Sequence, residues 1–285
     1  MTKEERAEVF QDTIDICRAG EYIAPSGDKV VIKNTEEMMS GTLFFSKKAN
    51  VTHTEIDDDE DCEITVINGD CLHVANDIVH DGYKTCVLNM ASFLRPGGGV
   101  ENGSSAQEEE LFRRTNLFMS LYQFAPIGER YGIKQKREQY PLEKNYGSIY
   151  TPSVTVFRDN AATDYDYLEE PFMIDVVTVP AIKNPALDSS GNFTELVLDA
   201  TKKKICQMLD LALLGKNNAI VLSAFGCGAY KNPPKAMATV FKTILSSERY
   251  KRAFNKVVFA IIDDRNAYRS DNTQGNYKPF KEIFS

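Results

Sequence analysis

Hydrophobic residues recur with helix-like and strand-like spacing along most of the chain. Apolar positions between Val9 and Cys17 repeat every three to four residues, which predicts a helix over 2–19. A turn with glycine follows and leads to a short strand predicted over 29–33. The segment 34–61 is polar and poorly periodic, so we expect it to complete an N-terminal layer and end in an exposed loop.

From residue 62 onward, apolar β-rich runs alternate with helix-like segments. Near-continuous apolar strands between helices are typical of a sheet covered on both faces, which is the α/β class. We predict an N-terminal accessory segment over 1–60 that packs on a main α/β domain over 61–285. The predicted strands are 62–67, 85–90, 172–179, 219–225 and 257–262, the predicted helices are 71–77, 106–124, 194–214 and 234–246, and an insertion over 128–166 carries short strands at 148–151 and 154–157.

Composition places the chain among ordinary globular proteins, with 42% hydrophobic and 26% charged residues. Its apolar runs are much shorter than the roughly 20 residues that a membrane span needs. The N-terminus MTKEERAEVF lacks the apolar core of a secretory signal. We therefore expect no membrane association and a cytoplasmic location, with a nuclear location left open.

Charge and metal-binding residue types narrow the partners further. Lys and Arg total 33 against 41 Asp and Glu, a net charge of −8, and no basic block is present. Duplex-binding proteins usually carry a basic face, so no direct duplex nucleic-acid binding is expected. The six cysteines form no C-x-x-C pair, and the three histidines lack a completing ligand set. We expect neither a metal site nor a cofactor.

A first chemical motif follows the predicted strand 85–90. It consists of Gly97-Gly98-Gly99 and, after seven residues, Gln107-Glu108-Glu109. Adjacent glycines let a ligand approach backbone N–H groups, and a loop between a strand and a helix start is where anions bind in α/β sheets. Ser104 and Ser105 have capping-box spacing to Gln107 and Glu108, which predicts a helix start near Ala106. Neither the dinucleotide-binding nor the P-loop glycine pattern is present.

This motif resembles the signature of the poly(ADP-ribose) glycohydrolases, and the sequence from Leu111 to Leu117 is similar to the family's following helix. Further similarities favour the bacterial-type branch and extend over most of the chain. The resemblance implies a macrodomain-like three-layer α/β/α core with a mixed sheet and an N-terminal helical and strand extension. It also implies that the substrate is an ADP-ribose polymer or an ADP-ribosylated macromolecule.

The resemblance assigns roles to the residues of the first motif. Glu109 is the implied general acid that later activates water, and Glu108 is implied to hydrogen-bond ribose hydroxyls. Gln107 helps to position them, and Asn89 at the strand end is a further implied substrate contact. Adjacent helical side chains diverge by about 100°, so we do not expect the two glutamates to act as a facing pair.

A second glycine loop follows the predicted strand 219–225. Pro233 and Pro234 then suit a turn and a helix start. The resemblance implies that this loop cradles a diphosphate and that its aromatic residue lies near the distal ribose. Cys227 has no histidine partner apparent in sequence, which disfavours a nucleophile and favours a small residue that permits close approach. The implied substrate-binding residues are thus Asn89, Gly97, Gly98, Gly99, Gln107, Gly226, Cys227, Gly228, Ala229 and Tyr230.

The predicted function is hydrolysis of ribose–ribose O-glycosidic bonds in poly(ADP-ribose), with release of ADP-ribose from chain ends. Two alternatives stay open. One is removal of single ADP-ribose groups from a modified protein or nucleic acid, and the other is a non-catalytic ADP-ribose binding module. The intact Glu108–Glu109 pair argues against pure binding.

Overall fold

The computed structural model describes residues 1–52 and 61–285. Its residues cluster into two compact units, each assembled from several chain segments. Unit 1 comprises Met1–Phe44, Asn89–Glu143 and Ile149–Thr178, and unit 2 comprises Phe45–Leu88, Lys144–Ser148 and Val179–Ser285. Among the described residues, no helix is long and apolar enough to cross a membrane.

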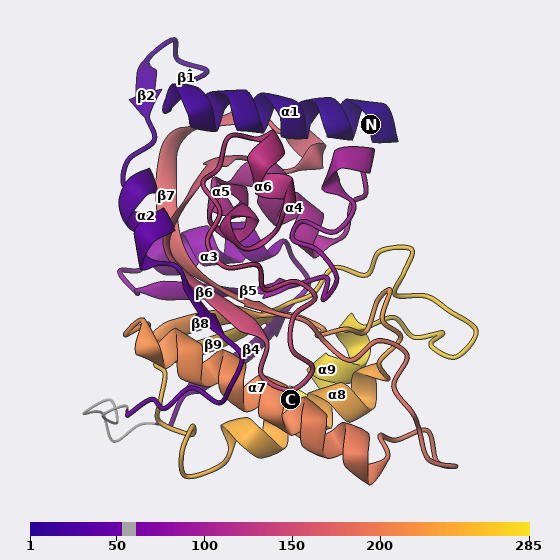
Figure 1. The fold of residues 1–285 in the computed structure, drawn as a ribbon. Coiled ribbons are helices and arrows are strands. Elements are labelled where there is room, and N and C mark those ends of the chain that lie inside the picture. The colour runs from indigo at the N-terminus through magenta and orange to yellow at the C-terminus, as the bar shows by residue number, and fades with distance from the viewer. Residues whose placement is uncertain (53–60) are drawn as a thin grey trace. The chain divides into compact units, whose positions relative to one another are not determined.

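Unit 2 carries the parallel part of a seven-stranded sheet (Figure 1). The neighbouring strands are, in order, β5 (Thr85–Met90), β8 (Ala219–Leu222), β9 (Lys256–Ala260) and β4 (Glu63–Ile67). Each neighbouring pair is parallel, with Thr85 opposite Ala219 and Ala219 opposite Lys256. All four residues of β8 are buried, which explains its continuous apolar sequence. The predicted strands 62–67, 85–90, 219–225 and 257–262 are confirmed, although β8 and β9 end before their predicted ends, at Leu222 and Ala260.

Helices cover both faces of this parallel sheet. The connections β4–α3–β5 and β8–α8–β9 cross the sheet in opposite directions. Right-handed crossovers therefore place α3 and α8 on opposite faces, as Figure 1 shows. α8 packs against both α7 and α9, and Phe280 of α9 lies against Phe259 of β9. The helices are α3 (Cys71–His80), α7 (Glu195–Leu214), α8 (Pro234–Leu245) and α9 (Tyr277–Phe284).

Unit 1 contains the N-terminal helix and an antiparallel strand pair. A capping box between Thr2 and Glu5 starts α1 (Lys3–Ala19), and Gly20, with φ 74°, ends it, in agreement with the helix predicted over 2–19. β6 (Ser148–Arg158) pairs antiparallel with β7 (Tyr167–Val179), so the whole sheet is mixed. β1 (Glu21–Ile23) and β2 (Lys29–Val31) form a small hairpin.

The polar stretch after β2 contains more structure than its sequence pattern predicted. It holds α2 (Thr35–Gly41) and β3 (Leu43–Phe45), two elements that the sequence pattern did not predict within the expected N-terminal layer. Most of the exposed loop expected at the end of this stretch lies outside the described residues. Met38 is fully buried, and this one anchored side chain fixes a helix too short to show periodicity.

The helix predicted over 106–124 is interrupted. It is divided into α4 (Gln107–Arg114), α5 (Leu117–Leu121) and a 3-10 turn (Tyr122–Phe124). Thr115 is extended and bridges Val156, and its hydroxyl accepts the amide of Leu117. Asn116 Oδ1 accepts the amide of Thr155 at 2.9 Å. These side chains satisfy backbone groups outside a helix, which is why Thr and Asn interrupt an otherwise apolar helical stripe.

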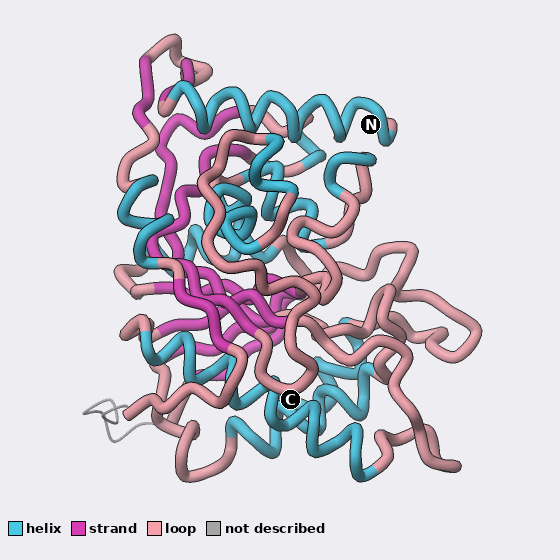
Figure 2. The backbone as a smooth tube through the Cα atoms, in the orientation of Figure 1, coloured by secondary structure: helices cyan, strands magenta, loops and turns pink. Residues whose placement is uncertain are grey.

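The two short strands expected in the insertion form one strand, β6. Its register against β7 shifts between Thr151 and Val154, where Pro152 and Ser153 intervene and Ser153 has φ 54°. α6 (Ile127–Arg130) precedes it, and no helix or strand is present over 131–147 (Figure 2). Short 3-10 turns at Val100–Asn102 and Ala161–Thr163 complete the elements.

Candidate active site

The first turn of α4 directs its polar side chains onto the backbone that follows β5. Gln107 Oε1 accepts the amide of Met90 at 2.8 Å. Glu108 accepts two amides, with Oε2 2.7 Å from the nitrogen of Ser92 and Oε1 3.1 Å from that of Gly97. These contacts fix the course of the chain between the strand and the glycine loop, within unit 1.

Glu109 continues this arrangement at the glycine loop. Its Oε1 accepts the amide of Gly99 at 2.8 Å, while Oε2 has no hydrogen-bond partner among the described residues. Gly98 has φ 52°, and a Cβ there would lie 2.5 Å from Glu109 Oε1 and 3.3 Å from Glu108 Oε2. Although they are adjacent on α4, both carboxyl groups therefore approach the same α-carbon. Glycine is required at 98 for its backbone conformation and for this approach.

The expected capping box at the start of α4 is wrong. Ala106 is the N-cap residue, and no side chain caps the helix there. Instead, the carbonyl of Ser104 accepts a hydrogen bond from the buried guanidinium of Arg113. The side chains of Gln107, Glu108 and Glu109 accept backbone amides of the segment between β5 and α4, so they do not cap the helix's own amides.

Glu108 holds a proton more tightly than an ordinary glutamate does. Burial raises the pKa of Glu108 to about 8, and the neighbouring charge of Glu109 also raises it. The amides of Ser92 and Gly97 and the side chain of Asn89 act in the opposite direction. Because burial outweighs these hydrogen bonds, Glu108 is mostly protonated at pH 7, and its O–H is available to a ligand hydroxyl.

Asn89 lies at the end of β5, as the sequence predicted. Its side chain is fully buried, and Nδ2 donates to Thr178 Oγ1 at 3.2 Å. Its Oδ1 has no hydrogen-bond partner among the described residues. A buried amide oxygen in this state is an acceptor that a ligand hydroxyl can satisfy.

The N-terminal helix braces the turn that precedes α4, a feature that sequence reasoning missed. Arg6 Nε donates to the carbonyl of Gly103 at 2.7 Å, and Arg113 Nε donates to the carbonyl of Arg6 at 3.0 Å. A Cβ on Gly103 would lie 1.8 Å from the carbonyl oxygen of Lys3. The sequence signal was Gly103 alone, and its partners are about 100 residues away in the chain.

The second glycine loop belongs to unit 2 and follows β8. Gly226 has φ 71°, and a Cβ there would lie 2.4 Å from Ala181 Cβ and 2.6 Å from Asn232 Nδ2. Asn232 Nδ2 donates to the carbonyls of Gly226 at 3.0 Å and Ile182 at 2.8 Å. Gly226 is therefore required by local packing, and Asn232 is a loop-fixing residue that the sequence analysis did not identify.

The remaining loop residues differ in what they offer a ligand. The amide N–H groups of Gly228 and Ala229 have no hydrogen-bond partner among the described residues. Cys227 is fully buried, and burial raises the pKa of its thiol well above the usual range, although Arg269 lowers it. A neutral, buried thiol is a poor nucleophile. The Tyr230 ring has the Lys183 ammonium 6.0 Å from its centre.

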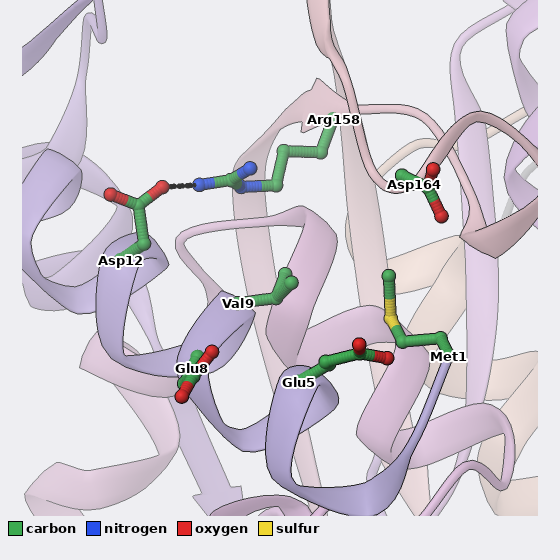
Figure 3. A pocket seen from close by; sticks show the side chains of 7 residues that line it. All are labelled: Met1, Glu5, Glu8, Val9, Asp12, Arg158 and Asp164. Atoms are coloured by element: carbon green, nitrogen blue, oxygen red, sulfur yellow. Dashed lines mark hydrogen bonds and ion pairs between the residues drawn. The ribbon is translucent and has the colours of Figure 1, made fainter.

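A cavity of about 550 Å³ lies elsewhere in unit 1, beside the first turns of α1 (Figure 3). Arg158 of β6 reaches it and pairs with Asp12, and its guanidinium lies 4.2 Å from the Tyr167 ring centre. None of the predicted site residues lines this cavity. Its lining residues are Met1, Glu5, Glu8, Val9, Asp12, Arg158 and Asp164. The described residues contain no cluster of three or more His, Cys, Asp or Glu side chains placed to hold a metal ion.

Comparisons with known proteins agree with these features. A family model described as "Microbial-type PARG, catalytic domain" matches residues 10–159. The structure of poly(ADP-ribose) glycohydrolase (PARG) from Thermomonospora curvata is 26% identical with a TM-score of 0.78, over 98% of this chain and 99% of that one. The same enzyme bound to the inhibitor ADP-HPD gives a TM-score of 0.75 with the same identity and coverage. PARG from Deinococcus radiodurans in complex with ADP-ribose is 25% identical with a TM-score of 0.65, over 90% and 99%.

No curated protein matches the chain. The family match and the two bacterial structures define the class, a glycosidase with a macrodomain-like α/β fold. The chain belongs to the microbial-type PARG catalytic-domain family. The predicted family and fold class are confirmed, whereas the roles of individual residues stay predictions.

Proposed function

We propose that this chain hydrolyses the ribose–ribose O-glycosidic bonds of poly(ADP-ribose) and releases ADP-ribose from chain ends, with Glu109 as general acid and then general base. One observation carries the assignment of residues. Glu108 and Glu109 are both buried, yet both are held by backbone amides beside Gly98. Burying two adjacent carboxyl groups costs free energy that hydrogen bonds offset only in part, and glycosidic hydrolysis provides a role for each of them.

The two glutamates differ in ways that suit different roles. Oε2 of Glu109 has no hydrogen-bond partner in the part of the chain that the structure describes, so it is the atom that would deliver a proton to the leaving ribose oxygen. As the C–O bond breaks, the Glu109 carboxylate that has given up its proton stabilises the positive charge that develops on the ribose. The Glu109 carboxylate then takes a proton from water while that water bonds to the anomeric carbon, which restores the acid.

Glu108 and the glycine loops hold the substrate in this proposal. The protonated Glu108 donates to a ribose hydroxyl, while its two oxygens keep the amides of Ser92 and Gly97 in place. In the first loop the amides of Gly97 and Gly99 donate to the glutamates, whereas Gly98 N–H has no partner among the described residues and is proposed as a donor to the ligand. In the second loop the amides of Gly228 and Ala229 are proposed to bind the diphosphate.

The proposed activity is tested with two labelled substrates. We expect the protein to release ADP-ribose from poly(ADP-ribose) and to leave a mono-ADP-ribosylated protein largely intact. Early reaction products from long polymers should be free ADP-ribose, because the enzyme acts at chain ends. Faster release from the mono-modified protein would favour the alternative hydrolase, and early accumulation of shorter oligomers would contradict chain-end cleavage. Binding without turnover of either substrate would leave only a binding module.

Gly228→Ala tests the diphosphate loop, and the structure makes it a clean substitution. A Cβ on Gly228 meets only Asn266 Cβ at 3.7 Å, and the residue lacks a positive φ. Folding stability should therefore change little, whereas a methyl group beside the loop amides should weaken ADP-ribose binding about tenfold or more. Calorimetric affinity for ADP-ribose and the thermal unfolding midpoint are the two measurements.

Gly69→Ala is the matched control for this substitution. A Cβ on Gly69 also makes only ordinary contacts, at 3.5 Å to Ile67, and the residue follows β4, which β9 separates from β8 in the sheet. It should leave ADP-ribose affinity unchanged. Gly99→Ala is less informative, because its Cβ would lie 2.4 Å from Ser104 Oγ. Unchanged affinity in Gly228→Ala would show that the second loop is only a turn.

A further inference from the structure

One cation, Arg269, holds the second glycine loop from its carbonyl side. Its Nη1 donates to the carbonyl of Cys227 at 2.5 Å, to that of Gly228 at 3.2 Å and to that of Asn266 at 3.3 Å. Its Nε donates to Asp271 Oδ1 at 2.9 Å. The Arg269 side chain is only 16% exposed, whereas that of Asp271 is 62% exposed. Arg269 is thus a largely buried charge placed on the backbone of the loop.

The two carbonyls of the loop that Arg269 binds belong to the peptide groups whose N–H ends are unpartnered. The peptide group that contains the Cys227 carbonyl ends in the N–H of Gly228, and the one that contains the Gly228 carbonyl ends in the N–H of Ala229. Neither N–H has a partner among the described residues. Because a peptide group is a conjugated unit, a cation at its oxygen withdraws electrons and makes its N–H a stronger donor.

The position of Arg269 also bears on how a negatively charged protein could bind an anion. The protein carries a net charge of −8, yet a diphosphate is an anion. A guanidinium behind the loop contributes positive potential, and it does so without occupying the ligand-facing side. Its three carbonyl contacts also hold the two N–H groups in one orientation, so little ordering remains to be done on binding.

We propose that Arg269 is a positioning residue that orients and polarises the amides of Gly228 and Ala229 for an anionic ligand. The inference rests on the proposed role of this loop in diphosphate binding. A residue that only supports the surrounding fold would affect every ligand of the site alike, but a residue that acts on the loop amides affects only a ligand that carries the anionic diphosphate. The neutral nucleoside adenosine and the dianion ADP-ribose share the adenosine part and differ in the diphosphate, so their comparison separates the two roles.

The experiment measures displacement of a fluorescent ADP-ribose derivative by ADP-ribose and by adenosine. In Arg269→Gln, affinity for ADP-ribose should fall by about tenfold or more, the scale of a lost charge-assisted hydrogen bond, while affinity for adenosine stays within about twofold. Arg269→Lys keeps the charge but not the fork, and should lie between Gln and the unmodified protein. Arg265→Gln, an exposed arginine in the same segment, removes the same charge and should change neither affinity.

Three outcomes separate this inference from the function on which it rests. Equal losses for ADP-ribose and adenosine would show a merely structural Arg269, and unmodified affinities in both Arg269 variants would overturn its role altogether. If instead the unmodified protein binds adenosine as tightly as ADP-ribose, the proposed diphosphate loop fails whatever the Arg269 variants do. Should Arg269→Gln fail to fold, the intermediate loss expected for Arg269→Lys, again confined to ADP-ribose, carries the test.

Discussion

Glu109→Gln should lower kcat by about 10² to 10⁴-fold while leaving ADP-ribose affinity within a few-fold, because it removes the proton donor and keeps the shape of the side chain. The structure favours this substitution. An amide oxygen can still accept the Gly99 amide at the position of Oε1, and the new NH₂ group replaces Oε2, which has no partner among the described residues. The loop should therefore keep its course.

Single-turnover cleavage of labelled polymer gives the rate, and calorimetry with ADP-ribose gives the affinity. Glu129→Gln, an exposed glutamate of α6, is the control for loss of one negative charge and should turn over normally. Near-normal turnover by Glu109→Gln would move the general acid to another residue, with Glu108 the first candidate because of its raised pKa. A parallel collapse of rate and affinity would instead indicate a damaged loop.

The parallel core was predictable because its signal is local. Strands buried on both faces must be apolar throughout, so runs such as the one in β8 are visible in sequence. Likewise, the signals that begin and end a capped and periodic helix such as α1 lie in the helix itself and in the residues next to it. The interruption at Thr115 was not predictable, because its cause is a bridge to Val156, about 40 residues further along the chain.

The site was predictable in its residue types but not in its contacts. The glycine and glutamate pattern identified which residues belong together, and the structure then showed that the amides of Gly97 and Gly99 serve the glutamates. Arg269 and Asn232 had no sequence signal, since an arginine or asparagine in a polar loop has many common uses. The boundary near residue 60 stays a prediction, as do the individual catalytic roles.

The second large effect concerns stability. The pKa of Glu108 is about 8 in the folded protein against an ordinary value of 4.5, so between these pH values the folded chain binds a proton that the unfolded chain lacks. Stability contributed by this group is therefore fully present below about pH 4.5, declines as pH rises and is lost above about pH 8. In Glu108→Gln, which cannot ionise, this decline is absent.

Between pH 5.5 and pH 8 the unmodified protein should therefore lose stability that Glu108→Gln keeps. The free energy of unfolding of the variant minus that of the unmodified protein should increase by on the order of 3 kcal/mol over this range. At pH 5.5 the variant should be the less stable of the two. The carboxyl group accepts the backbone amides of Ser92 and Gly97, and the NH₂ group of glutamine cannot accept one of them.

The chain has 13 tyrosines and no tryptophan, so urea unfolding is best followed by far-ultraviolet circular dichroism. Glu170→Gln, an exposed glutamate of β7, is the charge-matched control. Stability curves for Glu108→Gln and the unmodified protein that run parallel with pH would show that Glu108 is ionised in the fold, and Glu108 could not then donate a proton to a ribose hydroxyl at neutral pH.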